Sequence, residues 1–396
     1  MSTATGPQIP EEGLILFSLG DFSYAFLRVL ETTNHGETVM IVQQRSRLGP
    51  EGNYIARRVL PTSPKHDPES LARIRARLEE EARLATYLDH PNIARVLGRA
   101  ESQGALYILC ERVSGTRLDT YVTAACMRGV CLSAGLALYV GAEVASALHH
   151  AHTRTDEKGR PLGIIHRDVN PARIYLKADG SVRLTDFALA RSLLQGRVAT
   201  TVPSPQGDAF YGAPEALLGE PMDPRSDLFA LGLVMLEIAT GRGLYGTLTV
   251  RAADLEEALT PEVRAKVVAA HNLATIAELP EQVDDYILRA ATYTAREVEE
   301  LTENVFPPLR SILRALLQRR PEDRYPSAAA LEDDLRKGLA ALGAPYGAPE
   351  AIAELRRMAS AARMHKDVGG PTAQDSASTT RKLSADHVIT SPGSSA

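Results

Sequence analysis

Residues 164–176 read IIHRDVNPARIYL, a stretch whose polar side chains are spaced for the transfer of a group to a hydroxyl. Asp168 follows a His-Arg pair, as it would in a loop whose carboxylate accepts a proton from a hydroxyl. At position 173, five residues further on, phosphoryl-transfer chemistry needs an oxygen ligand for magnesium. This chain has Arg173 there, and a guanidinium offers five donors and no acceptor. The stretch has the form of a catalytic loop but lacks one metal ligand.

The composition is that of a globular protein with more than one structural unit. The chain has 396 residues, which suits two lobes or domains plus a tail. Its net charge of −5 gives no reason to expect nucleic acid or a membrane surface as partner. No apolar run reaches the roughly 20 residues that span a bilayer, and the start MSTATGPQIPEEG lacks the features of a signal peptide. Three cysteines fit reduced thiols, so we expect a cytoplasmic location.

The order of the predicted elements indicates an α+β protein, with a sheet first and helices after it. Residues 14–60 hold short apolar runs separated by turn residues, which is the pattern of strands joined by hairpins. Residues 69–88 have apolar positions at helical spacing, and two further strands follow. After about residue 114 the pattern is mostly helical. From about residue 367 the chain is rich in Ser, Thr, Gly and Pro, so we expect it to be disordered.

Seven motifs follow one another in an order that resembles the eukaryotic-type Ser/Thr protein kinase family in its bacterial form. They are EARLATYLDHPNI, LYILCERV, HRDVNPARI, LTDFALAR, YGAPEAL, DPRSDLFALG and RRPEDRY. The resemblance implies a bilobal fold that binds ATP and magnesium between a small β-rich lobe with one helix and a larger helical lobe. The predicted divisions are a flexible N-terminus (1–13), an N-lobe (14–113), a C-lobe (114–345) with an enlarged helical segment at about 245–305, a helix (346–366) and a disordered tail (367–396).

The residues that match the family's chemistry are mainly acids. The resemblance makes Asp168 the residue that orients the substrate hydroxyl and takes its proton, with Asn170 beside it where a lysine usually contacts the γ-phosphate. It makes Asp186 the magnesium ligand and Glu81 the partner of a strand cation. These acids also hydrogen-bond local backbone in such loops, so their presence alone does not prove catalysis. The cofactor-binding residues that the resemblance implies are Gly20, Ala56, Arg58, Glu81, Glu111, Val113, Arg173 and Tyr175.

Other matches are expected to be architectural. The resemblance implies a buried ion pair between Glu215 and Arg324, which would connect the segment with the YGAPEAL motif to the helical lobe. It implies that Asp227 anchors the catalytic loop and that His166 stacks on Phe187.

Several positions depart from the family pattern where the nucleotide is held. The strand motif reads I-A-R-R at 55–58, so Arg58 stands where a lysine is usual; it keeps the charge and can pair with Glu81, but it is a planar fork. The phosphate loop, assigned to 19–29, keeps only Gly20 and is about two residues short. Asp21 would turn a carboxylate toward phosphate.

Further departures affect the metal and the substrate platform. Arg173 cannot coordinate magnesium, and it can instead contact phosphate or pair with Asp186 and close the metal site. Ala188 replaces a glycine at a backbone pivot. Asp208 stands where a threonine usually contacts Asp168, and a carboxylate there would raise the pKa of Asp168 or displace it.

The residues that hold the fold are kept and those that do chemistry are changed, which favours a pseudokinase acting as a scaffold or allosteric partner. Two alternatives stay open: an active but atypical Ser/Thr kinase using one magnesium ion, and a nucleotide-binding sensor without transfer. We expect a protein partner or protein substrate, another kinase among them, and neither nucleic acid nor membrane. Residues 245–305 are a candidate partner surface, and the candidate phosphorylation sites are Ser192, Thr200, Thr201 and Ser204.

Overall fold

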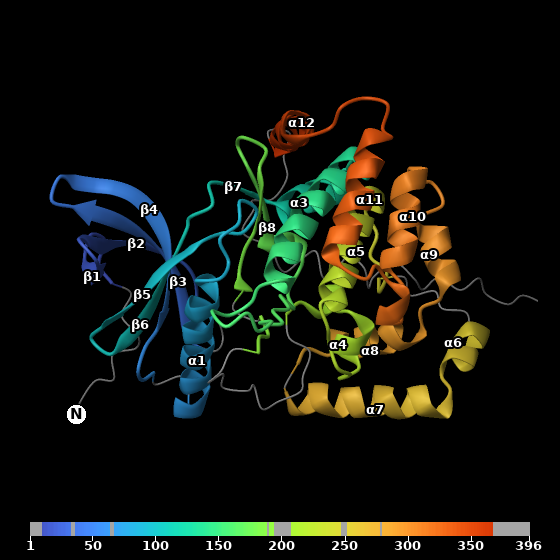
Figure 1. The fold of residues 1–396 in the computed structure, drawn as a ribbon, viewed down its shortest axis with the longest axis horizontal. Coiled ribbons are helices and arrows are strands. Elements are labelled where there is room, and N and C mark those ends of the chain that lie inside the picture. Colours follow the sequence, from blue (N-terminus) through green and yellow to red (C-terminus); the bar gives the residue numbers. More distant parts are fainter. Residues whose placement is uncertain are drawn as a thin grey trace, which may run out of the picture.

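A computed structural model shows two lobes, a curved sheet with one helix and a larger helical body (Figure 1). The kinase-like bilobal architecture predicted from the motif order is confirmed. The structure describes residues 10–32, 36–63, 67–187, 190–193, 207–246, 252–277 and 279–366. The predicted flexible start, apart from residues 10–13, and the predicted disordered tail lie outside these ranges. Within them, no helix is long and apolar enough to cross a membrane.

The N-lobe is built on one antiparallel sheet of six described strands, in the order β1-β2-β3-β4-β6-β5. Because side chains alternate along a strand, the sheet has two distinct faces. One face packs Val59 and Ile108 against Leu78 of helix α1, and the other carries a separate cluster around Met40 and Ala56. The elements are β1 (Ile15–Leu19), β2 (Phe22–Thr32), β3 (Glu37–Ser46), β4 (Gly49–Val59), α1 (Pro68–Ala85), β5 (Val96–Ser102) and β6 (Ala105–Cys110).

Helix α1 begins where the sequence gives it a strong start signal. The carboxylate of Asp67 accepts the backbone N–H of Ser70 at 2.8 Å, and Pro68 occupies the first turn. The buried positions Leu71, Ile74 and Leu78 recur at helical spacing, and Glu81 continues the same buried stripe. The packing that fixes α1 on the sheet therefore also turns Glu81 inward.

The C-lobe surrounds two helices, α3 and α5, that are buried along most of their length. Helix α5 ends at Gly241, whose φ of 65° is the left-handed cap that glycine adopts without strain. A small sheet, β7-β8-β9, lies at the border between the lobes. The elements are β7 (Gly115–Arg117), α2 (Leu118–Met127), α3 (Ala134–His152), β8 (Ile174–Lys177), β9 (Val182–Leu184), α4 (Pro214–Leu217), α5 (Arg225–Thr240), α10 (Pro307–Leu316) and α11 (Ala328–Ala340).

The enlarged segment at about 245–305 consists of helices α6 (Ala252–Ala258), α7 (Pro261–Ile276), α8 (Gln282–Thr292) and α9 (Ala295–Leu301). Figure 1 shows α7 running along the base of the C-lobe, below α4 and α8. The helix predicted at 346–366 is α12 (Ala348–Lys366). It packs on α2 and α3, and Glu354 accepts the hydroxyl of Ser133 at 2.5 Å, so α12 is part of the body.

The ion pair predicted between Glu215 and Arg324 is confirmed and is almost completely buried. Two guanidinium nitrogens of Arg324 donate to the two carboxylate oxygens of Glu215, each at 2.8 Å. Arg324 also donates to the carbonyl oxygens of Gln318 and Arg319, and Ser226 donates to Glu215. This pair joins α4, α5 and the segment before α11.

We predict that Arg324→Ala lowers the free energy of unfolding by about 3–5 kcal/mol, because it leaves the Glu215 carboxylate buried without its cation. Chemical denaturation of the purified chain measures the change. The matched control is Arg320→Ala, since Arg320 pairs with Glu322 on the surface and its loss should leave the denaturation midpoint unchanged. Equal midpoint shifts in the two variants would contradict the role given to the buried pair.

Candidate active site

The register of strand β4 decides which arginine faces the cleft between the lobes. Ile55 and Arg57 line the cleft, whereas Ala56 is fully buried in the core on the opposite face. Arg58 also points to that opposite face, beside Tyr107. The assignment of Ala56 and Arg58 to the cofactor site is therefore corrected to Ile55 and Arg57, because a shift of one residue along a strand exchanges the two faces.

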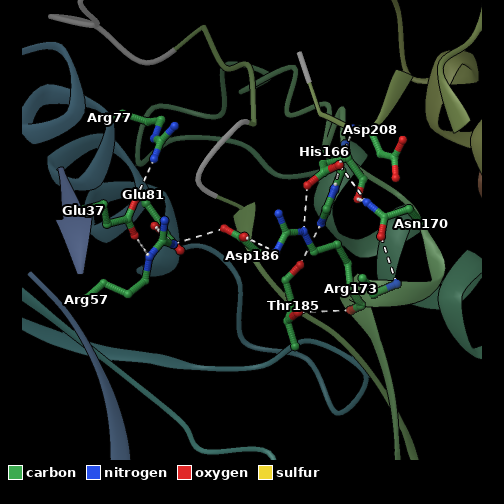
Figure 2. Close-up of polar contacts among 12 residues, drawn as sticks. Glu37, Arg57, Arg77, Glu81, His166, Asn170, Arg173, Thr185, Asp186 and Asp208 are labelled. Atoms are coloured by element: carbon green, nitrogen blue, oxygen red, sulfur yellow. Dashed lines mark hydrogen bonds and ion pairs between the residues drawn. The ribbon is translucent and has the colours of Figure 1, made fainter. Parts of the chain in front are cut away.

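Arg57 is shared by three carboxylates (Figure 2). Its Nε donates to Glu37 at 2.5 Å, and its Nη1 donates to Glu81 at 2.6 Å and to Asp186 at 3.1 Å. The predicted pairing of Glu81 with a strand cation is thus present, with Arg57 as the cation. The three acids come from strand β3, helix α1 and the segment after β9, so Arg57 connects three parts of the molecule.

Glu37 was not predicted from the sequence. Its side chain is 2% exposed and accepts from Arg57 and, at 2.6 Å, from Arg77 of helix α1. Glu37 follows the β2–β3 turn, so it lies at the end of a hairpin that borders the cleft. The carboxylate therefore holds the sheet and helix α1 together at the cleft.

The hairpin over the cleft is β2–β3 and not the predicted loop at 19–29. Gly20 lies in a two-residue turn in which Leu19 pairs with Phe22, between β1 and β2. The residues of this lobe that line the cleft come instead from the next hairpin, with Leu30 and Val39 among them. Since β4 pairs with β3 and β3 with β2, strand β1 is too far from Arg57 for its turn to reach the cleft. The assignment of Gly20 to the cofactor site is therefore wrong.

Among the described residues, three donors hold the carboxylate of Asp168. Asn170 donates through Nδ2 to Oδ1 at 2.7 Å, and the backbone N–H of Asp208 donates to the same oxygen at 3.0 Å. The Nε of Arg173 donates to Oδ2 at 2.7 Å. Asp168 is therefore held on both oxygens.

Asp208 lies beside Asp168, the position that the sequence predicted for it. The contact from Asp208 differs from the prediction, because its backbone N–H and not its carboxylate faces Asp168. The Asp208 carboxylate accepts the backbone N–H of Phe210 at 3.1 Å and so caps the short turn that follows.

Arg173 contacts both acids that the family's chemistry would use, Asp168 and Asp186. Figure 2 shows its contact with Asp186. While its Nε donates to Asp168, its Nη1 lies 2.8 Å from Oδ2 of Asp186. The other oxygen of Asp186, Oδ1, accepts from Arg57. Both oxygens of Asp186 are therefore engaged by guanidinium groups. Of the arrangements predicted for Arg173, the structure has the pairing with Asp186.

This arrangement does not fit a magnesium ion. Magnesium takes hard oxygen ligands in an octahedral set, and both carboxylates that could supply them point at arginine nitrogens. A guanidinium has no acceptor atom, and its positive charge repels a cation. As they lie, Asp168 and Asp186 are ion-pair partners and not metal ligands.

The loop that carries Asp168 is anchored from helix α5, as predicted. The Asp227 carboxylate accepts the backbone N–H groups of His166 and Arg167 at 2.8 and 2.9 Å, and it pairs with His152 at 2.8 Å. The predicted stack of His166 on Phe187 is also present, with ring centroids 4.5 Å apart. Buried contacts therefore fix both ends of the segment that holds the acids.

The cleft itself is a cavity of about 670 Å³. Of the residues assigned to the cofactor or the metal from the sequence, it is lined by Glu81, Glu111, Val113, Arg173, Tyr175 and Asp186. Asn170 reaches the site through its bond to Asp168. The members of its ion-pair network that the sequence did not single out are Glu37, Arg57 and Arg77.

The pKa values of Asp186 and Glu81 shift in opposite directions, although Arg57 lowers both. Burial by itself raises the pKa of Asp186, but Arg57 and Arg173 outweigh it and hold that pKa well below its usual range. Burial raises the pKa of Glu81 to about 7, because Arg57 offsets it only in part and Asp186 and Glu37 add their negative charges. Of these two acids, Glu81 is the one that takes up a proton first as the pH falls.

The segment after Asp186 is described only in part. Ala188, Thr200, Thr201 and Ser204, for which pivoting or phosphorylation was considered, lie outside the described residues. Ser192 is 3% exposed, and its hydroxyl donates to Glu80 of helix α1 at 2.7 Å. A kinase could reach this hydroxyl only after the segment had opened.

The comparisons with known proteins agree with the fold. The model of the protein kinase domain matches residues 46–335, so the chain belongs to the protein kinase domain family. The match begins after the hairpin that carries Glu37.

The relatives are bacterial kinases. The tyrosine-protein kinase MasK of Myxococcus xanthus is 28% identical over 83% of this chain and 44% of its own length. The serine/threonine-protein kinase PknA of Mycobacterium tuberculosis is 32% identical over 60% of this chain and 52% of its own. This chain therefore spans about half, or less, of the length of these relatives. A PknI kinase domain structure from M. tuberculosis, a double mutant, aligns with a TM-score of 0.50 at 22% identity, over 83% of this chain and 99% of its own, which shows the fold alone.

We predict that the ionisation of Glu81 makes the protein less stable as the pH rises from about 4.5 to 7. The folded state keeps a proton that the unfolded state loses in this window, so the free energy of unfolding falls with rising pH. The decline is at most about 3 kcal/mol. Denaturation curves between pH 5 and 8 measure it as the difference between the native chain and Glu81→Gln.

The matched control is Glu79→Gln on the outer side of the same helix, where Glu79 is part-exposed and pairs with Arg75. This variant should keep the pH dependence of the native chain. A pH dependence in Glu81→Gln identical to that of the native chain would rule out Glu81 as its source.

Proposed function

We propose that this protein is a pseudokinase, a kinase-like domain of Ser/Thr type that acts by binding another protein and not by transferring phosphate. The observation that carries the proposal is the position of Arg173, which bridges Asp168 and Asp186 at 2.7 and 2.8 Å. The two acids that would serve as base and metal ligand are thereby paired with an internal cation.

The proton-accepting role of Asp168 is weakened by its contacts. A general base must present a free oxygen to the substrate hydroxyl within hydrogen-bonding distance. Both oxygens of Asp168 already accept hydrogen bonds, Oδ1 from an amide and Oδ2 from the guanidinium of Arg173. A substrate hydroxyl would have to displace one of these donors.

The conformation supports a binding role. Glu81 pairs with the strand cation, Phe187 stacks on His166, and the two lobes are joined through Asp186, all by contacts between the chain's own residues. A domain that keeps this shape through its own ion pairs can present a constant surface to a protein partner, as a scaffold or an allosteric activator would. Another kinase is the partner that such a surface suits.

An active but atypical kinase is the second candidate, and the comparisons favour it. The curated relatives carry the names of tyrosine-protein and serine/threonine-protein kinases, although this chain spans only part of their length. Asp168 and Asp186 are both present, so release of Arg173 would return them to a kinase-like arrangement. The cleft is also large enough for a nucleotide, so a sensor that binds a nucleotide without transferring phosphate stays a third candidate.

We predict no phosphate transfer from labelled ATP to the chain itself or to a generic protein substrate, beyond that of Asp168→Asn. The assay should include analysis of phosphorylated Ser, Thr and Tyr, since the named relatives differ in their acceptor residue. Transfer by the native chain that disappears in Asp168→Asn would establish the active kinase instead.

We further predict that Arg173→Asn creates a response to magnesium. The substitution removes the cation from Oδ2 of Asp186 and supplies an amide oxygen in its place. At millimolar ATP, magnesium should leave the melting temperature of the native chain unchanged and raise that of Arg173→Asn. Arg160→Asn is the matched control, because Arg160 pairs with Asp156 outside the cleft and the same substitution there should produce no response. If magnesium left the melting temperature of Arg173→Asn unchanged, Arg173 would not be the residue that prevents magnesium from binding at Asp186.

A further inference from the structure

The cation that would meet a nucleotide's phosphates is already occupied by carboxylates. In the kinase family the corresponding strand cation contacts the α- and β-phosphates and the helix glutamate. Here Arg57 retains the glutamate contact, and its Nε, at 2.5 Å, is taken by Glu37. Glu37 is a negatively charged oxygen group held against this cation, as a phosphate would be.

The floor of the cleft has no positive charge to spare for further anions. Its ion-pair network contains Glu37, Glu81, Asp168 and Asp186 against Arg57, Arg77 and Arg173. When all are ionised, four negative and three positive charges leave one net negative charge. A triphosphate would add more negative charge, and magnesium cannot offset it while arginines hold Asp186.

The other end of the cleft is suited to an uncharged, flat ligand. Its walls include the aliphatic side chains of Leu30, Val39 and Ile55 and the ring of Tyr175. Val113 lies in the hinge, the segment 111–114 that connects strand β6 to strand β7. Among the described residues, no backbone carbonyl accepts the N–H of Val113, so this N–H is available to a ligand. A planar nitrogen heterocycle could accept this N–H and fill the apolar space.

Exposed arginines at the opening do not reverse this balance. The cavity is also lined by four exposed arginines, Arg28, Arg95, Arg112 and Arg117. Solvent and salt screen such charges far more than they screen the buried floor. The selectivity of the cleft is therefore set by the buried network.

We propose that Glu37 occupies the phosphate position of the cleft, so that the cleft takes an uncharged planar heterocycle such as a nucleoside in preference to its triphosphate. This inference rests on the proposed function, because it assumes that the ion-pair network stays closed. The retained hinge holds the heterocycle, and the network rejects the phosphates.

Calorimetric titration with adenosine, AMP and ATP, each with and without magnesium, tests the proposal on the full chain. We expect adenosine to bind, the affinity to fall with added phosphate so that ATP is at least about tenfold weaker, and magnesium to have no effect. ATP binding as tightly as adenosine, or adenosine not binding at all, would overturn the proposal.

Glu37→Gln tests the residue itself. It removes one negative charge beside Arg57, so the ratio of adenosine to ATP affinity should fall about tenfold. Glu101→Gln is the matched control. Glu101 pairs at 2.7 Å with Arg75 of helix α1, outside the cleft, so this variant should leave the ratio unchanged. An unchanged ratio in Glu37→Gln would contradict the role of Glu37. The transfer assay is independent of these ratios, so failure of the proposed function and failure of this inference can be distinguished.

Discussion

The sharing of one guanidinium, Arg57, among three carboxylates is the interaction on which the arrangement of the cleft depends. Glu37 belongs to the sheet, Glu81 to helix α1 and Asp186 to the segment that follows β9. A buried charge is costly unless it is paired and hydrogen-bonded, so moving any one of these elements away would break a buried ion pair with Arg57. The ion pairs of Arg57 thus fix the position of the N-lobe relative to Asp186 in the C-lobe.

Arg173 extends this constraint into the C-lobe. In an arrangement that relies on a nucleotide and a metal, closure depends on ligand concentration, since a ligand shifts a conformational equilibrium only through its differential affinity. Here the positive charges come from Arg57 and Arg173, which are part of the chain. The ion pairs that connect Asp186 to both lobes are therefore made by side chains of the protein itself and do not depend on a bound ligand.

The fold could be predicted from the sequence because its signals are redundant. Seven motifs in order, a strong start for α1 and a buried α5 all indicate the same architecture. The site was less predictable where a single residue decides it. In the run IARRV the adjacent residues Arg57 and Arg58 face opposite sides of the strand, and the sequence alone does not say which of them faces the cleft. Only the pairing of β4 with its neighbours decides this.

Glu37 shows a second limit of the sequence. Its partners Arg57 and Arg77 lie 20 and 40 positions away along the chain, so no local pattern reveals their contact. The phosphate loop was misplaced for a related reason: the first hairpin carries a glycine and an acid in a turn, and nothing local says that a second hairpin lies nearer to β4. Strand order is a property of the whole sheet.

The backbone conformation of the site indicates that the surrounding structure holds its acids in a defined orientation. Arg167 and Asp186 have φ values of 67° and 66°, a left-handed conformation that costs roughly 1–3 kcal/mol for residues other than glycine and persists only where the surroundings enforce it. The surroundings here are Asp227, which accepts the N–H of Arg167, and the two arginines that hold Asp186. The strained backbone at Asp186 turns its carboxylate into the space between Arg57 and Arg173. The left-handed backbone at Asp186 therefore serves, in this chain, to complete an ion pair across the cleft.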